Sequence, residues 1–134
     1  MITVQNTINA SIDEVWKYWT LPEHIQNWNI AIDDWYTSYV ESDLKVGGKF
    51  KYKMNKKDTS LSFDFEGIYT KVENLSLIEY KLFDNRTGKV NFEINENKVK
   101  ITETFEPTKE DPESMQKEWC QTVIDNFKKY VESV

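Results

Sequence analysis

Two neighbouring segments of the chain, 49–54 and 62–67, alternate strictly between apolar and charged residues. A period of two is typical of β-strands whose two faces lie in different environments. A hairpin that pairs Met54 with Phe63 keeps apolar residues opposite apolar residues and lysines opposite acids, whereas a one-residue slip would mix them. The sequence therefore predicts this register and one wide apolar face. That face carries Phe50, Tyr52, Met54, Phe63 and Phe65.

Length and composition limit the class of protein. The 134 residues suit one domain, 1–134, and an aromatic content of 14% is too high for a disordered chain. A formal net charge of −6 argues against a nucleic-acid partner. No apolar run reaches the ~20 residues of a transmembrane segment, and the N-terminus lacks signal-peptide features. The single cysteine, Cys120, excludes an internal disulfide, so we expect a cytoplasmic protein.

The rest of the chain completes the fold class. The patterns predict a strand over 3–9, a short helix capped by Ser11, and a second short helix from Pro22 to Trp28. Strands follow over 35–41, 75–83, 90–94 and 99–105, and one long helix covers about 113–131. This order indicates an α+β protein. Its curved antiparallel sheet has six to seven strands, and the long helix lies across the concave face.

The sequence contains no strong catalytic or metal-binding motif and suggests no cofactor. His24 is the only histidine, and without a partner motif a capping or exposed role is favoured over that of a general base. Cys120 is expected to be a small buried apolar residue. No spacing of histidine, cysteine and carboxylate residues suggests a metal site.

Glu103 is the one polar residue that breaks the apolar alternation of its strand. The predicted register places it opposite Val90 on the apolar face, where burial would raise its pKa. It is therefore a candidate polar anchor or general acid in a cavity. The alternative is a local bulge, or pairing at the rim of the sheet, that gives Glu103 only a structural role.

Large apolar side chains could line a pocket between the long helix and the sheet. Trp28 and Trp35 flank the junction 29–34 between the short helices and the sheet. The expected lining combines these with residues of the sheet and the long helix: Trp28, Trp35, Phe50, Tyr52, Met54, Phe63, Phe65, Glu103, Met115 and Trp119. A fully packed core, or an aromatic patch for a protein partner, is the alternative.

An ordered set of motifs along nearly the whole chain resembles a known family. The set comprises INASIDEVW (8–16), WTLPE (19–23), Trp28, Asp34-Trp35, DLKVGGKF (43–50), FDFEG (63–67), Thr104-Phe105 and WCQTVIDNF (119–127). It resembles the SRPBCC (START-like, helix-grip) superfamily and, within it, the family of the activator of heat-shock-protein-90 ATPase. The resemblance implies a curved seven-stranded sheet that grips a C-terminal helix over a cavity. Trp28, Trp35, Met54, Phe63, Phe65 and Trp119 would then be cavity or mouth residues.

The resemblance also implies candidate functions. Members of the superfamily bind lipids, polyketides, plant hormones and other apolar molecules, and some are enzymes. We expect binding of a small hydrophobic or aromatic molecule. The alternatives are an enzyme that uses Glu103 or His24, and a co-chaperone-like interaction module with a chaperone partner. The heat-shock activator carries an extra N-terminal domain for which this chain has no room. The sequence does not choose between a monomer and a homodimer.

Overall fold

The computed structural model describes residues 1–29 and 34–133. β1 (Ile2–Ile8) is followed by two short helices, α1 (Ile12–Thr20) and α2 (Pro22–Trp28). Six strands follow: β2 (Trp35–Ser42), β3 (Lys49–Lys56), β4 (Ser62–Glu73), β5 (Leu77–Leu82), β6 (Thr87–Asn95) and β7 (Lys98–Phe105). The chain ends in the long helix α3 (Glu113–Ser133). This α+β order agrees with the prediction.

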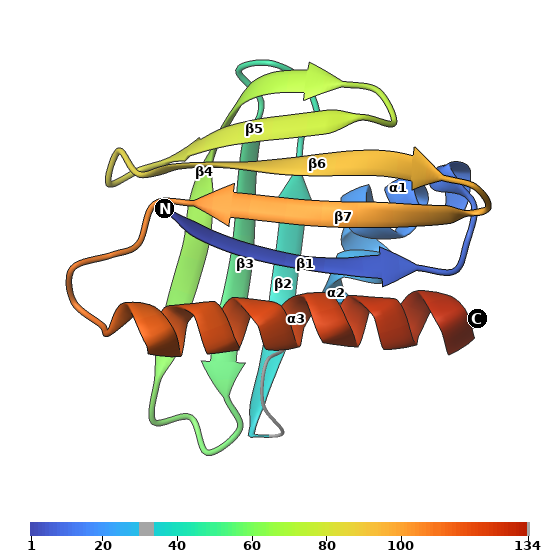
Figure 1. The fold of residues 1–134 in the computed structure, drawn as a ribbon. Helices are drawn as coiled ribbons and strands as arrows, with labels where there is room; N and C mark the ends of the chain where they lie inside the picture. Colours follow the sequence, from blue (N-terminus) through green and yellow to red (C-terminus); the bar gives the residue numbers. More distant parts are fainter. Residues whose placement is uncertain (30–33, 134) are drawn as a thin grey trace.

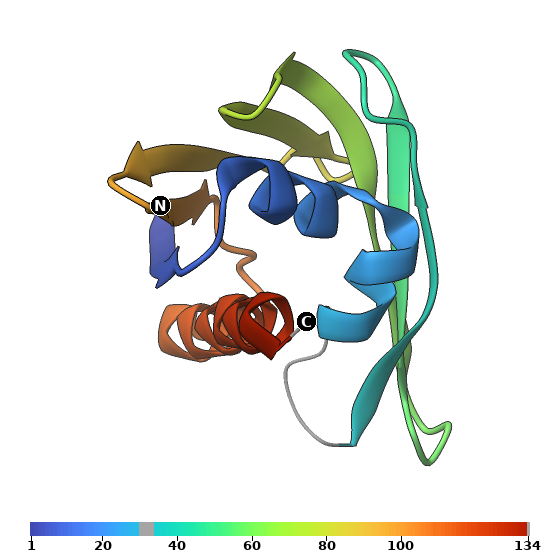
Figure 2. The same ribbon diagram turned by 90° about the vertical axis from the view of Figure 1, so that its right-hand side faces the viewer.

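The strands form one seven-stranded antiparallel sheet in the order β1-β7-β6-β5-β4-β3-β2. The sheet curls into a half-barrel, with α1 and α2 at one end of its concave side and α3 running across it (Figures 1 and 2). The predicted hairpin register is confirmed, since Met54 pairs with Phe63. Glu103 also pairs with Val90 as expected.

The sequence prediction was wrong about the end of β4. This strand continues past Gly67 to Glu73, and β5 begins at Leu77 instead of Leu75. The pairing of β4 with β5 shifts register between Tyr69 and Lys71. The shift breaks the alternation that the prediction followed, because a bulge adds one residue to one strand. Leu75 has a φ of 64° and lies in the turn.

One hydrophobic core extends along the concave face of the sheet, and α1 and α2 pack on one end of it. Ser11 caps α1 as predicted, because its Oγ accepts a hydrogen bond of 3.3 Å from the amide of Glu14. Trp19 stacks on Trp28 with ring centroids 4.7 Å apart, and both rings meet Phe127 edge-on at 4.9 Å. Burial of several large aromatic side chains, each contributing about 1.5–3 kcal/mol, holds the three helices on the sheet.

α3 is held along its C-terminal half. Ile124, Phe127 and Val131 are buried, and α3 packs against β1, α1 and α2. Polar contacts fix it to β1: Asn6 donates to Asp125 at 2.9 Å, and the side-chain amide of Gln121 donates to the carbonyl of Gln5 at 2.9 Å. Among described residues, the N-terminal half of α3 has no fully buried side chain. This half is the less closely packed part of the helix.

Candidate ligand-binding site

An inner aromatic cluster covers the concave face of β3, β4 and β5. It comprises Phe50, Tyr52, Phe65, Tyr69 and Tyr80. The ring of Phe50 lies 4.9–5.9 Å from each of the other four rings. Alternation along each strand brings these rings to one face, as the sequence predicted for Phe50, Tyr52 and Phe65. The cluster forms an apolar floor beneath the N-terminal half of α3.

A second group of rings, the rim trio, joins three elements at the edge of this floor. Trp35 from β2 meets Phe63 from β4 and Trp119 from α3, with centroid separations of 5.7 Å in both cases. Phe63 and Trp119 are 6.5 Å apart. Phe63 is 42% exposed and Met115, one helical turn before Trp119, is 51% exposed. These side chains border solvent.

Glu103 lies on the concave face of β7, deep in the protein. Its backbone pairs with Val4 on one side and Val90 on the other. Its Oε2 accepts a hydrogen bond of 2.9 Å from the Tyr80 hydroxyl. Burial raises the pKa of Glu103 to about 7, and the Tyr80 hydrogen bond opposes this rise. The carboxyl group is therefore shared between its neutral and charged forms near neutral pH.

Neighbouring groups respond to the same environment. Burial, and then the charge of Glu103, raise the pKa of Cys120 on α3 to about 12, so its thiol stays protonated and is no nucleophile. Burial also raises the pKa of Tyr52 well above its usual value, and the charges of Tyr69 and Glu103 add to the effect. β3, β5, β7 and α3 thus all contribute to one enclosed site.

Side chains in this site keep accessible surface despite their depth. Tyr52, Glu103 and Cys120 are surrounded by protein atoms, but each remains only partly buried. A partly accessible side chain at such depth needs adjoining space at least as wide as a water molecule. These three side chains therefore border space that water can reach.

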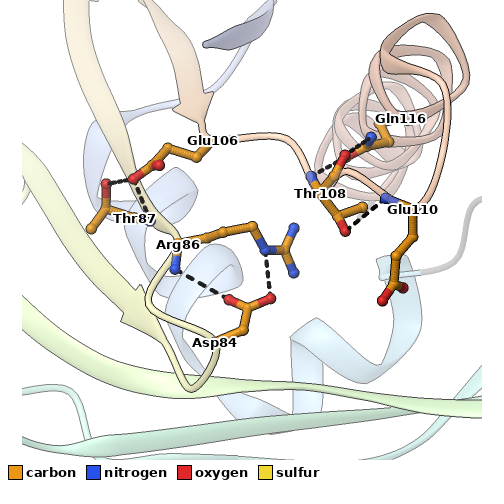
Figure 3. Close-up of polar contacts among 7 residues, drawn as sticks. All are labelled: Asp84, Arg86, Thr87, Glu106, Thr108, Glu110 and Gln116. Atoms are coloured by element: carbon orange, nitrogen blue, oxygen red, sulfur yellow. Dashed lines mark hydrogen bonds and ion pairs between the residues drawn. The ribbon is translucent and has the colours of Figure 1, made fainter.

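The short polar linker between β7 and α3, residues 106–112, sets where α3 begins. Gln116 accepts a hydrogen bond from the amide of Thr108 and donates to the carbonyl groups of Thr108 and Asp111, all at 2.9 Å. Figure 3 shows Gln116 facing back onto Thr108, and two residues before Thr108 the side chain of Glu106 accepts a hydrogen bond from Thr87 at the start of β6. These contacts tie the N-terminal half of α3 to the sheet through the linker, while its side chains over the floor stay partly exposed.

The structure places two sequence candidates away from this site. Trp28 is 3% exposed, and its indole N–H donates to the carbonyl of Tyr18 at 2.8 Å, so it is part of the packed core. His24 Nδ1 lies 2.7 Å from the Tyr130 hydroxyl. Tyr130 is ten residues beyond Cys120, or about 15 Å along the helix. His24 thus joins α2 to the C-terminal end of α3, outside the Glu103 site.

Two other sequence candidates are more buried than expected. Phe50 is 3% exposed, and Met54 is 7% exposed with its sulfur 3.4 Å from Nδ2 of Asn29. Phe50 is the central ring of the inner aromatic cluster, whereas Met54 lies against Asn29. The junction 30–33, which the sequence placed near the mouth, lies outside the described residues.

Two surface hollows lie elsewhere on the protein. One surface hollow of about 320 Å³ lies between Ala10–Ile12 and the β6–β7 turn, and another of about 530 Å³ lies at the β2–β3 turn. Neither borders the inner aromatic cluster or the rim trio. Within 1–29 and 34–133, no three histidine, cysteine or carboxylate side chains are grouped to hold a metal ion. No described helix has the length and apolar character to cross a membrane.

Comparisons with known proteins agree with this architecture. Residues 9–132 match the family model of the Activator of Hsp90 ATPase homolog 1-like protein. The chain belongs to this AHSA1-like family. An AHSA1-like protein from Aeromonas hydrophila is 34% identical to it, with a TM-score of 0.88 over 98% of this chain and 93% of that one. Chr148 from Cytophaga hutchinsonii is 39% identical, with a TM-score of 0.86 over 98% and 92% of the two chains.

The AHSA1-like fold extends to more distant structures. CalU16 from Micromonospora echinospora is 16% identical, with a TM-score of 0.72 over 96% of this chain and 74% of that one, which shows the shared fold alone. No curated protein matches the chain. The family resemblance predicted from the sequence is thus confirmed, and the helix-grip fold of the SRPBCC superfamily with it.

Sequence reasoning missed Tyr80 as a residue of the candidate site. It predicted the strand over 75–83, which contains Tyr80, but did not link this residue to Glu103. The missed signal is Gly88, which pairs with Tyr80 in the neighbouring strand. A Cβ atom added to Gly88 would clash with the Tyr80 ring. The glycine leaves the room that lets the tyrosine side chain cross β6.

Proposed function

We propose that this AHSA1-like protein binds a small apolar or aromatic molecule between the N-terminal half of α3 and the inner aromatic cluster. The observation that carries the proposal is the partial accessibility of Tyr52, Glu103 and Cys120 deep inside the protein. Binding sites of this type are mostly apolar and contain a few polar groups that orient the ligand. The aromatic floor and the single carboxyl group have this composition.

The rim trio gives the proposal a path of entry. Phe63 and Met115 are largely exposed, and the half of α3 that carries Met115 and Trp119 is less closely packed than the other half. A ligand that enters beside Trp119 would bury apolar surface, which contributes about 25 cal/mol for each Å² removed from water. The packed α1 and α2 end would remain unchanged.

Native mass spectrometry of freshly purified protein tests the proposal directly. A co-purified small molecule, released on denaturation, is the expected result. A library of apolar and aromatic compounds provides the second arm: ligands should quench tryptophan fluorescence and raise the melting temperature with concentration. Neither a co-purified molecule nor a shift across the library would contradict the proposal.

A second candidate function is an enzyme that uses Glu103 as a general acid or base. The observation that favours it is the pKa of Glu103, about 7, since proton transfer is most efficient when the catalytic pKa is near the working pH. The test is to incubate any molecule recovered from the protein with wild-type protein and with Glu103→Gln. Chemical conversion by the wild type alone would support this function.

A further inference from the structure

The charge balance around Glu103 is unusual. Five elements bring side chains to it: β5 contributes Tyr80, β3 contributes Tyr52, α3 contributes Cys120, and β1 and β6 contribute apolar valines. Among the described residues, no lysine, arginine or histidine is paired with this carboxyl group. The protein thus buries an acid and supplies no cation for it, which costs free energy whenever the acid is ionised.

One oxygen of Glu103 is also left for a ligand. Oε2 accepts the Tyr80 hydrogen bond, while Oε1 has no hydrogen-bond partner within the described part of the chain. No buried polar side-chain atom among the described residues lacks a partner, so Oε1 keeps contact with accessible space. The free oxygen therefore borders space that a ligand group can reach.

The walls of the site also favour a positive charge. Glu103 lies beside the inner aromatic cluster. In this cluster the ring centroids of Tyr52 and Phe65 are 5.7 Å apart, and those of Phe65 and Tyr80 are 5.8 Å apart. The faces of such rings attract cations, and removal of the cation from water strengthens the attraction. A carboxylate and several ring faces together form a site for an ammonium group.

We infer that the ligand is an organic amine whose ammonium group pairs with Glu103 while its apolar body lies on the aromatic floor. This inference rests on the proposed function, because it names the chemistry of the ligand at the same site. A carboxylic acid ligand would bring a second negative charge to Glu103. An alcohol would leave the ionised carboxyl group without a counter-ion. An ammonium group supplies the counter-ion that the ionised carboxyl group lacks among the described residues.

The pairing makes binding depend on pH. An ammonium group pairs with the ionised form of Glu103, so affinity should rise as the pH increases through about 7. Well below that pH, affinity should fall up to about tenfold for each pH unit, since the carboxylate must first lose its proton. A carboxylic acid ligand would show the opposite trend.

Three probes with one apolar body test the inference: 2-naphthylmethylamine, 2-naphthalenemethanol and 2-naphthoic acid. Titration calorimetry between pH 5.5 and 8 gives each affinity. The amine should bind at least tenfold more tightly than the alcohol at pH 8, and the acid should bind most weakly. Glu103→Gln should reduce amine binding to the level of the alcohol and leave the alcohol unchanged.

Two further variants separate local from general effects. Glu93→Gln removes an exposed carboxylate on β6 and changes the net charge equally, so it should keep the preference for the amine. Tyr80→Phe removes the hydrogen bond that lowers the pKa of Glu103, so it should move the rise in amine affinity to higher pH. It also provides a readout if Glu103→Gln does not fold.

The outcomes distinguish the inference of an amine ligand from the proposed ligand-binding function on which it rests. Equal binding of amine and alcohol, tighter binding of the acid, or an equal loss in Glu93→Gln would overturn the inference and leave a ligand site. Failure of all three probes to bind at millimolar concentration would contradict the proposed function, and the inference with it.

Discussion

The side chain of Tyr80 crosses the neighbouring strand at Gly88, and its hydroxyl group reaches Glu103 two strands away. Gly88 is buried and pairs directly with Tyr80, and any larger residue there would occupy the space of the tyrosine ring. A strand interior usually disfavours glycine. Here the close approach of the Tyr80 ring accounts for the glycine. Because Gly88 leaves room for Tyr80, it allows the hydrogen bond between Tyr80 and the carboxyl group of Glu103.

Gly88→Ala should therefore destabilise the protein and disturb Glu103. We expect a loss of about 1–3 kcal/mol in the free energy of unfolding, because the added methyl group must displace a packed ring. Urea denaturation measures the loss. Lys89→Ala, on the exposed face of the same strand, should change stability by less than about 0.5 kcal/mol. Equal stability of Gly88→Ala and wild type would refute the account of Tyr80.

Glu103 should also make stability depend on pH. Its pKa is raised in the folded protein, to about 7 from an ordinary 4.5, so the folded state binds the proton more tightly than the unfolded state. Stability should fall as pH rises from about 4.5 to 7, by at most about 3 kcal/mol at about 1.4 kcal/mol for each pH unit.

Urea denaturation of Glu103→Gln between pH 5.5 and 8 checks this dependence. The variant should lack that fall and, above pH 7, should be at least as stable as wild type. A parallel pH dependence in both proteins would assign the effect to other groups.

Trp119 and Trp28 should separate binding from folding. Trp119→Ala should cost about 1–2 kcal/mol and weaken binding of 2-naphthalenemethanol about tenfold, because the rim trio is only partly buried. Trp28→Phe should cost about 1–3 kcal/mol, through the lost indole hydrogen bond and volume, without changing affinity. Denaturation and calorimetry on the same samples give both quantities. The reverse pattern would place the ligand at the core end.

His24 and Tyr130 should act as a structural pair. His24→Ala and Tyr130→Phe each remove the 2.7 Å hydrogen bond, so the double variant should lose less than the sum of the two. We expect a coupling of about 0.5–1.5 kcal/mol in a double-mutant cycle. Ligand affinity should remain unchanged in all three variants. A loss of affinity in His24→Ala alone would restore His24 as a site residue.

Gln116 should control the start of α3. Gln116→Ala removes three hydrogen bonds to the linker and should cost about 1–3 kcal/mol. Amide hydrogen exchange at Thr108 should accelerate at the same time, because that amide loses its acceptor. Lys117→Ala, at an exposed neighbouring position, is the control. Unchanged exchange at Thr108 would show that the linker is fixed by other contacts.

The strict alternation from Lys49 to Gly67 made much of the sheet predictable, because only one register keeps both faces consistent. The same rule placed Glu103 opposite Val90 on the inner face. The extension of β4 was not predictable, since a bulge near Tyr69 changes the phase of the pattern.

Packing at the candidate site was harder to predict than the sheet. Periodicity shows which face Trp28 occupies but not whether neighbouring side chains enclose it, and here Trp19 and Phe127 do so. The contact between Tyr80 and Glu103 spans strands that are far apart in sequence. Such a contact depends on the three-dimensional pairing of Gly88 with Tyr80, which no local pattern contains.

The division of α3 into an anchored half and a partly exposed half has a consequence for how relatives of this protein can diverge. Substitutions at Met115, Trp119 and Val123 change exposed or partly exposed side chains of α3 and leave the buried anchor residues Phe127 and Val131 untouched. New ligand preferences could then arise in one helix at little thermodynamic penalty. A combinatorial library confined to these positions would sample recognition while most of its members still fold.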